Sequence, residues 1–206
     1  MIRPRTSLLR WRGVAVVGAV VGASALTACS GGSSSGSPPT PPTRTARTTH
    51  TVPHEKGTTA PGTNIRPGRS VIVRFHPDKS HNSLISLTVT RVQKGSVKDL
   101  GKFTLPAAAR KSSVYYVHAR VKNTGTGNLS GTRLMLYGEI RPTLVVPPTR
   151  FATTFAHCND QPLPKHFIKS RVADLCMVLL APHAGTVRAV QWRFPDNVEP
   201  ISWKLS

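Results

Sequence analysis

Residues 114–125 read Val-Tyr-Tyr-Val-His-Ala-Arg-Val-Lys-Asn-Thr-Gly, and they decide the fold. Every second side chain from Tyr115 to Val121 is apolar, and polar side chains stand between them. Alternation with a period of two is typical of a β-strand with one face in the core and one in solvent. The Asn-Thr-Gly that follows is a turn signal. We therefore expect a strand over residues 114–122, with these side chains facing outward: Tyr116, His118, Arg120 and Lys122.

Strand patterns recur on both sides of this stretch. Apolar residues alternate with polar ones or form short apolar runs, and Gly and Pro separate the segments. In the C-terminal segment, residues 201–205, Ser202 and Lys204 are expected to face away from the core. The further segments that we expect to form strands are residues 71–75, 84–92, 134–137, 176–180, 190–194 and 201–205.

Two other segments complete the fold prediction. The prolines of residues 141–150 place them in a loop or in an edge segment. A helical turn is expected only within residues 97–109. About seven short strands, broken by Gly and Pro and without an amphipathic helix, predict an all-β fold for residues 69–206, as an antiparallel sandwich of two sheets.

The N-terminus has the order of a secretory signal. A basic stretch comes first, an uncharged run over residues 14–28 follows, and small residues end it. The closing Leu26-Thr27-Ala28-Cys29 resembles the lipobox of bacterial lipoproteins. This resemblance implies that residues 1–28 are a signal peptide, that cleavage falls between Ala28 and Cys29, and that Cys29 carries a diacylglycerol with palmitate-type acyl chains.

An uncleaved membrane span is the alternative interpretation of this segment. The uncharged run of residues 14–28 would form about 22 Å of helix. That length falls short of the ~30 Å hydrocarbon core of a bilayer. The length therefore favours a cleaved signal over a span, and two acyl chains on Cys29 would hold the protein stably on the membrane.

Residues 29–68 are predicted to form a disordered tether. They are rich in Ser, Thr, Pro and Gly and show no apolar periodicity, so they lack the apolar surface needed to offset the entropy of ordering. The functional interpretation is a spacer that lifts a domain from the membrane into the wall. The alternatives are a plain linker and a substrate for O-glycosylation.

Two cysteines remain after Cys29. Cys158 and Cys176 form an even pair in a chain that we expect to be exported, which predicts one disulfide bond. The alternative is a metal or nucleophile role. The position of Cys176 in the middle of an apolar strand suits neither of these.

The strand and turn of residues 114–125 also resemble an uncharacterised family of immunoglobulin-like domains on secreted Gram-positive lipoproteins. The resemblance covers roughly residues 84–205 and implies an immunoglobulin-like sandwich, without implying an activity. In that family a Gly usually precedes the second Cys, where this chain has Lys169-Ser170. Later residues that fit the family pattern are Cys158, Leu163-Pro164, Phe167, Cys176-Met177-Val178, Pro182 and Ile201-Ser202-Trp203.

No catalytic motif or Gly-rich phosphate loop stands out, so no catalytic residue, metal ligand or cofactor is predicted. The nearest approach to a metal cluster is His76-Pro77-Asp78 with His81, which we interpret as a polar turn between strands. Asp196 and Glu199 are close in sequence and are interpreted as part of a loop. The chain is expected not to be an enzyme.

The net charge of +20 favours anionic partners. Residues 69–206 hold 20 Lys and Arg against seven Asp and Glu. Arg91, Lys94, Lys98 and Lys102 crowd one connection, and Lys165 and Lys169 form a second group. The functional hypothesis is attraction to anionic wall polymers or lipid headgroups; generic solubility is the alternative.

Together these patterns predict a lipoprotein held by its acyl anchor on the extracellular face of the cell membrane. Its β domain is expected to act as a binding or accessory module directed toward the cell wall. The expected partners are the membrane, an anionic wall polymer, a lipid headgroup or an envelope protein, and an exported protein is not expected to meet nucleic acid. The alternatives are an envelope enzyme with an unfamiliar site and a carrier of a small apolar ligand held between the sheets.

Overall fold

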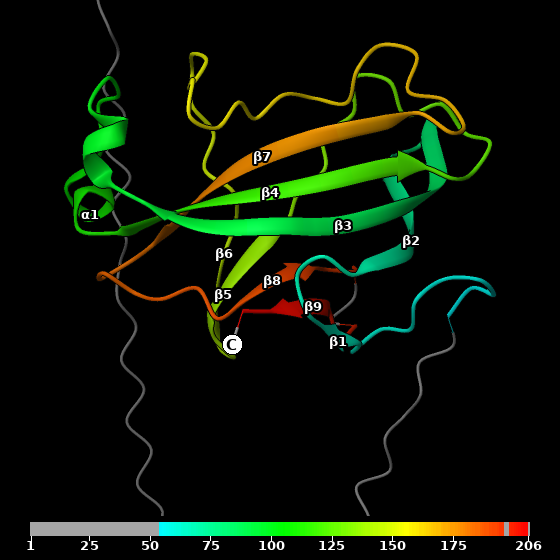
Figure 1. The fold of residues 1–206 in the computed structure, drawn as a ribbon, viewed down its shortest axis with the longest axis horizontal. Coiled ribbons are helices and arrows are strands. Elements are labelled where there is room, and N and C mark those ends of the chain that lie inside the picture. The colour runs from blue at the N-terminus through cyan, green and yellow to red at the C-terminus, as the bar shows by residue number, and fades with distance from the viewer. Residues whose placement is uncertain (1–53, 196–197, 206) are drawn as a thin grey trace, which may run out of the picture. The chain divides into compact units, whose positions relative to one another are not determined.

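The computed structural model describes residues 54–195 and 198–205 (Figure 1). The predicted signal peptide, its cleavage site, the lipidated Cys29 and the tether as far as residue 53 lie outside the described residues. In the part that is described, no helix is long and apolar enough to cross a bilayer.

The larger sheet contains four antiparallel strands in the order β2-β3-β4-β7. Their bounds are Ser70–Asp78 for β2, His81–Gly95 for β3, Ser113–Asn123 for β4 and Val172–Ala181 for β7. Figure 1 shows these strands side by side in one layer. The strands predicted at residues 71–75, 84–92, 114–122 and 176–180 are thereby confirmed, and each runs further than the sequence pattern indicated.

The smaller sheet contains five strands in the order β1-β9-β8-β5-β6. It includes the predicted C-terminal strands and, at one edge, a segment of the proline-bearing stretch 141–150. All pairs are antiparallel except β1 with β9, which is parallel. The bounds are Asn64–Ile65 for β1, Tyr137–Arg141 for β5, Leu144–Val146 for β6, Ala189–Trp192 for β8 and Ile201–Lys204 for β9.

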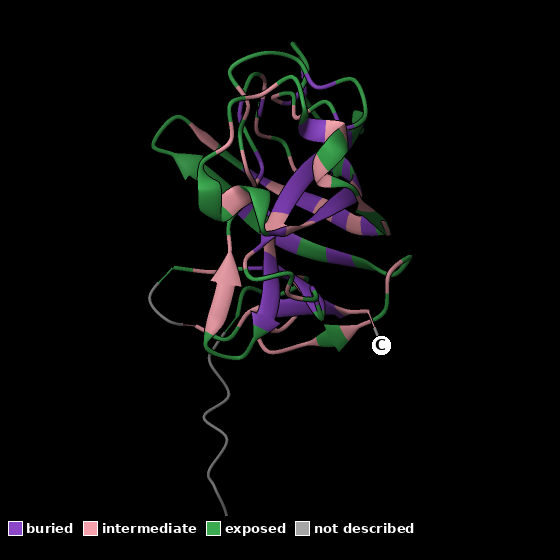
Figure 2. Ribbon diagram, turned by 90° about the vertical axis from the view of Figure 1, so that its left-hand side faces the viewer, coloured by how far each residue is buried: buried purple, intermediate pink, exposed green. Residues whose placement is uncertain are grey.

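The two sheets pack face to face, so the predicted all-β, immunoglobulin-like two-sheet sandwich is confirmed. Figure 2 shows the buried residues concentrated between the layers. Val117, Ala119 and Val121 of β4 are buried in this core together with Trp203 of β9. Burying alternate side chains of both sheets against one another is the main stabilising term of such a domain.

Among the described residues, helical structure occurs only around the region where it was expected. A 3₁₀ helix η1 covers Val97–Leu100, and a single turn α1 covers Ala107–Arg110. Both lie in the connection from β3 to β4. The side chain of Ser96 accepts a hydrogen bond from the backbone N–H of Lys98, and Asp99 reaches back to the Ser96 backbone N–H, which caps the start of η1.

The strand predicted at residues 134–137 is wrong for all but its last residue. Leu134 and Leu136 are buried in the core, but they lie in an extended segment outside the sheets, and β5 begins at Tyr137. An apolar run reports burial whether or not its backbone joins a sheet, so its pattern cannot separate the two.

The prediction that residues 29–68 are all disordered is wrong for residues 54–68, which fold onto the domain. Asn64 and Ile65 pair with Ser202 and Trp203 in the parallel β1–β9 ladder. The backbone N–H of Gly68 donates to the carbonyl of Val89 at 2.7 Å. Backbone hydrogen bonds of this kind need no apolar pattern, and so the polar composition concealed them.

Three side chains that were predicted to face solvent are buried or half-buried in the structure. Tyr116 is buried with Leu100, Val114, Phe155 and Val178 in a second apolar cluster outside the larger sheet. Ser202 of β9 is only 3% exposed. His118 is half-buried beside Arg91, and burial lowers the pKa of its imidazole. Arg120 and Lys122 are exposed, as predicted.

Cys158 and Cys176 form the predicted disulfide bond, with Cα atoms 5.1 Å apart. The bond ties the loop of residues 151–160 to β7, and Cys158 is itself buried in the second apolar cluster. Closing a loop with a separation of 18 residues stabilises the fold by about 3 kcal/mol in the chain-entropy model.

Candidate functional site

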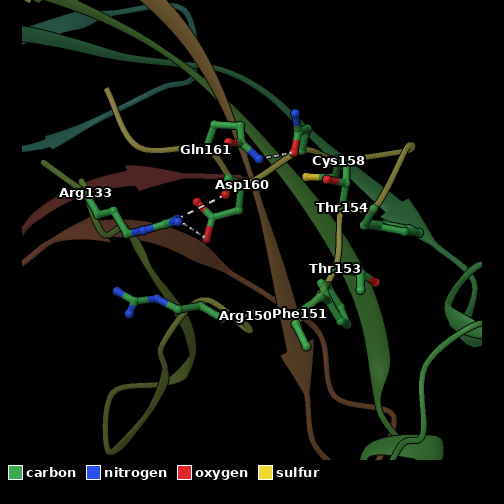
Figure 3. A pocket seen from close by; sticks show the side chains of 11 residues that line it. Arg133, Arg150, Phe151, Thr153, Thr154, Cys158, Asp160 and Gln161 are labelled. Carbon is green, nitrogen blue, oxygen red and sulfur yellow. Dashed lines mark hydrogen bonds and ion pairs between the residues drawn. The ribbon is translucent and has the colours of Figure 1, made fainter. Parts of the chain in front are cut away.

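A pocket of about 280 Å³ lies beside the disulfide loop. We call it the anion pocket, because two arginines and one aspartate line it. Figure 3 shows Arg133 and Arg150 on one side of it and the loop that carries Thr153, Thr154 and Asp160 on the other. Its lining residues are Arg133, residues 150–155 and residues 158–161.

Arg133 is held by the extended segment that leads into β5. Its neighbour Thr132 donates a side-chain hydrogen bond to the carbonyl of Leu129 at 2.7 Å, and the carbonyl of Thr132 accepts from the backbone N–H of Leu163 at 2.8 Å. Leu134 on the other side is buried in the core. The backbone that carries Arg133 is therefore fixed from both sides.

The opposite wall is anchored by aromatic packing and by the disulfide. Phe151 stacks on Phe103 with ring centroids 4.3 Å apart. The ring centroid of Phe155 lies 5.9 Å from that of Tyr116 in β4. Thr149, just before this wall, donates its backbone N–H to the carbonyl of Val178 at 2.7 Å. A loop held at both ends and at Cys158 presents its hydroxyl groups in a defined arrangement.

Arg133 and Asp160 make the principal ion pair of the pocket. Nη1 of Arg133 donates to the backbone carbonyl of Asp160 at 3.1 Å and lies 3.5 Å from its carboxylate Oδ2. Burial raises the pKa of the Asp160 carboxyl, and the charges of Arg133 and Arg150 oppose that shift. The two nearby guanidinium groups therefore offset part of the cost of holding this carboxylate where solvent reaches it poorly.

Arg150 has a weaker partner than Arg133. Its Nη2 donates to the thioether sulfur of Met135 at 3.6 Å, and a thioether is a weak acceptor. Two guanidinium groups and one carboxylate line the pocket, so one positive charge is left uncompensated among its lining residues. Guanidinium forks beside Thr hydroxyl groups are suited to bind a phosphate or carboxylate group.

A larger depression adjoins the anion pocket on the other side of Arg133. This aromatic groove has a volume of about 530 Å³ and lies at the open end of the sandwich, between β2 of one sheet and β5 and β8 of the other. Its lining includes Phe75, Tyr137, Trp192 and Phe194. Arg133 lines both depressions and so forms the wall between them.

The residues singled out from the sequence lie elsewhere. His81 Nδ1 is 2.9 Å from both carboxylate oxygens of Asp78, at the hairpin between β2 and β3. This contact and the backbone hydrogen bonds from Ser80 and His81 lower the pKa of Asp78, partly offset by desolvation. Among the described residues, no group of three or more His, Cys, Asp or Glu is placed to hold a metal ion. The Asp78–His81 pair closes a polar turn, as we interpreted it from the sequence.

The two predicted basic groups do not line the anion pocket. Arg91 and Lys94 lie in the last part of β3, and Lys98 and Lys102 follow in and after η1. These side chains, like Lys165 and Lys169, are exposed. Glu199 lies on the loop before β9, as expected, and its predicted neighbour Asp196 is outside the described residues.

Sequence reasoning missed the anion pocket itself. Arg133, Arg150 and Asp160 counted only toward the net charge, because each stands alone in its stretch of sequence. Arg133 and Asp160 are separated by 27 positions, and only the packing of the disulfide loop against the segment before β5 brings them together. The spacing of these residues carries no signal that would have identified the site.

Comparison of the chain with protein-family models, with curated proteins and with solved structures finds no match in any of the three. The resemblance to a family of immunoglobulin-like domains therefore stays a prediction from the residues quoted for it.

Proposed function

We propose that this protein is a lipid-anchored binding module that presents its β-sandwich to the cell envelope and holds an anionic group in the anion pocket. The observation that carries the proposal is that two guanidinium groups, those of Arg133 and Arg150, line the pocket with a single carboxylate, that of Asp160, which pairs with Arg133. A pocket with surplus positive charge, partly shielded from water, attracts a phosphate or carboxylate more strongly than an open surface does.

The lipobox at Leu26-Thr27-Ala28-Cys29 supports the location in this proposal. Removal of residues 1–28 and acylation of Cys29 would place the chain on the extracellular face of the cell membrane. The stretch from residue 30 to residue 53 would separate the anchor from the folded part. The ligands within reach of such a module are wall polymers, lipid headgroups and other envelope proteins.

A binding role is favoured over a catalytic one by the contents of the pocket. Asp160 is the only carboxylate among the lining residues of the anion pocket, and a general acid and base pair needs two titratable groups. Thr153 and Thr154 lie on the same wall without a His among the lining residues to activate them. The groups present bind and orient an anion.

The experiment measures binding of inorganic phosphate to the full chain by calorimetry, for the wild type and for three variants. Arg150→Ala and Arg133→Ala should each weaken binding about tenfold, since each removes a charge-assisted contact. Lys122→Ala removes an equal charge from the exposed face of β4 and is the matched control. Equal affinities for Arg150→Ala and Lys122→Ala would contradict the proposal, because binding would then depend on net charge alone.

The carrier of a small apolar ligand is a second candidate, and the aromatic groove is the observation that favours it. The groove lies between the sheets, where such a ligand would sit, and its lining includes Phe75 and Trp192. Full chain purified from cells and extracted with organic solvent would release the ligand for mass spectrometry. A stoichiometric apolar compound would favour the carrier over the anion-binding module.

A further inference from the structure

A third depression adjoins the aromatic groove at Arg193. This polar cleft has a volume of about 470 Å³ and lies on the face of the smaller sheet that carries Glu139, Gln191 and Ser202. Arg193 lines both the aromatic groove and the polar cleft, just as Arg133 lines both the anion pocket and the groove. Each depression therefore adjoins the next at an arginine, and we call the three together the row.

The aromatic groove has an apolar floor and a basic rim. Phe75 and Trp192 are buried and meet edge to face with ring centroids 5.8 Å apart, and Tyr137 is half-buried beside them. Arg133 and Arg193 are exposed at the groove, whereas the charge of Arg74 is paired with that of Glu55 beside it. The described lining of the groove contains no Asp or Glu. Apolar ring edges beside guanidinium groups suit a ligand with apolar faces and anionic substituents.

The polar cleft contains hydrogen-bonding groups that are buried and fixed. Glu139 is 8% exposed, and its Oε2 accepts from Nε2 of Gln191 at 2.7 Å and from Nζ of Lys204 at 3.1 Å. Nη1 of Arg193 donates to Oε1 of Gln191 at 2.9 Å. Two carboxylates, those of Glu139 and Glu199, and two cations, those of Arg193 and Lys204, line this cleft. A preorganised polar network without surplus charge suits hydroxyl groups, so the negative charges of a ligand would lie outside the cleft, toward the groove.

An acyl chain does not suit this row, because a chain running from the groove into the polar cleft would bury Glu139 and Arg193 without offering hydrogen bonds. A single small anion would occupy one depression and leave the other two unused. The ligand that matches all three is long, bears negative charges at intervals and carries hydroxyl groups between them.

We propose that the row of three depressions is a track for a linear anionic glycan, a chain of sugar units joined or substituted by phosphate. This inference rests on the proposed function, since the anion pocket holds the first phosphate of the chain. Arg193 holds a second phosphate between the groove and the polar cleft. The sugar units lie against Tyr137 and over the network of Glu139 and Gln191.

The test compares a hexose phosphate monomer with a linear hexamer of hexose units joined by phosphodiesters, both titrated into the full chain. The hexamer should bind at least about tenfold more tightly than the monomer, because it occupies several subsites at once. Arg150→Ala should weaken binding of both probes. Arg193→Ala and Tyr137→Ser should weaken the hexamer about fivefold and leave the monomer unchanged, since only the hexamer reaches these residues.

Lys122→Ala serves as the control for charge, and thermal unfolding of each variant confirms that it is folded. Inorganic polyphosphate with the same number of charges as the hexamer, and a single-stranded oligothymidylate, are the competing probes. Tighter binding of either one than of the hexamer would overturn the track, the second in favour of a nucleic-acid site.

The two proposals fail in different ways. If Arg150→Ala changes the affinity of neither probe, the anion pocket is wrong and the track is wrong with it. If Arg150→Ala weakens both probes but the hexamer binds no more tightly than the monomer, the anion pocket stands and the track alone is overturned.

Discussion

Arg133 and Asp160 meet across the anion pocket, with Nη1 of the arginine 3.5 Å from Oδ2 of the aspartate. The carboxylate therefore competes with any anionic ligand for the Arg133 guanidinium. The side chain of Asp160 is 20% exposed and that of Arg133 is 40% exposed, so the arginine is the partner that solvent reaches more easily. Because Asp160 competes with the ligand, a substitution of this one residue should change the affinity of the pocket for an anion.

Asp160→Asn is expected to strengthen phosphate binding about fivefold, because it removes the competing charge while it keeps the size of the side chain. The measurement is a calorimetric titration of the full chain with inorganic phosphate. Arg150→Ala is the opposite control, since it should weaken the same binding. Weaker binding in Asp160→Asn would mean that the carboxylate positions Arg133 for the ligand rather than competing for it.

Ser170→Gly is expected to stabilise the fold by about 1 kcal/mol. Ser170 has a φ of 69°, in the left-handed region that glycine adopts without a steric penalty. Its backbone N–H donates to the carbonyl of Asn123 at 2.7 Å, so the conformation is fixed by the fold. Chemical denaturation measures the free energy of unfolding. Lys169→Gly is the control and should be destabilising; equal effects of the two changes would rule out relief of strain.

The stability of the β3–β4 connection is expected to fall in acid through Asp99. The backbone N–H of Ser96 and the hydroxyl of Tyr116 donate to its carboxylate, and these bonds lower its pKa below the ordinary value of 3.8, partly offset by desolvation. Because the folded state favours the ionised form, this stabilisation is fully present above pH 3.8 and is lost as the pH falls through the lower folded pKa.

The measurement for Asp99 is the free energy of unfolding between about pH 5 and pH 2, in the wild type and in Asp99→Asn. The wild type should lose more stability than the variant over this range. Parallel curves would show that the Asp99 hydrogen bonds do not distinguish the ionised carboxyl from the neutral one.

Loss of the Cys158–Cys176 disulfide is expected to lower the free energy of unfolding by about 3 kcal/mol, through the added entropy of the unfolded chain. The double variant Cys158→Ala with Cys176→Ala should also bind phosphate more weakly, because Asp160 and the Thr wall are tied to β7 through this bond. Denaturation of the wild type with and without reductant provides the comparison. An unchanged midpoint in reductant would contradict the prediction.

Cys29→Ala is expected to leave the chain as an uncleaved precursor or to release it from the membrane, because the thiol is the group that would accept the lipid. Membrane fractionation followed by mass spectrometry of the intact protein is the measurement. Ser30→Ala is the matched control and should be processed normally. A Cys29→Ala product that is fully processed and still held on the membrane would rule out the lipobox.

The Asn-Thr-Gly motif of residues 123–125 predicted the turn but not the contacts that its first residue makes. The pattern predicted a turn after β4, and the structure shows that Asn123 also joins three segments. Its Nδ2 donates to the carbonyls of Gly127 at 2.8 Å and Phe167 at 2.9 Å, and its Oδ1 accepts from the Ser83 hydroxyl at 2.7 Å. A Cβ on Gly125 would lie 2.6 Å from the backbone nitrogen of Leu84, so the strand that passes the turn requires a glycine there.

The strands of the larger sheet and the disulfide followed from the amino-acid order alone, whereas the order of those strands in the sheet did not. Alternation along β4 is a property of neighbouring residues, since the backbone of a strand turns each successive side chain to the opposite face. The pairing of Cys158 with Cys176 followed from their number, once Cys29 had been assigned to the predicted lipobox. These predictions needed no knowledge of which segments meet.

Long-range packing determined the rest. The fold of residues 54–68 onto β9, the burial of Tyr116 and the meeting of Arg133, Arg150 and Asp160 all depend on segments far apart in the chain. No local period encodes such contacts, because they arise when two sheets and one bridged loop close on each other. The charge of this protein was readable from its composition, whereas the place where that charge can hold a ligand exists only in the folded chain.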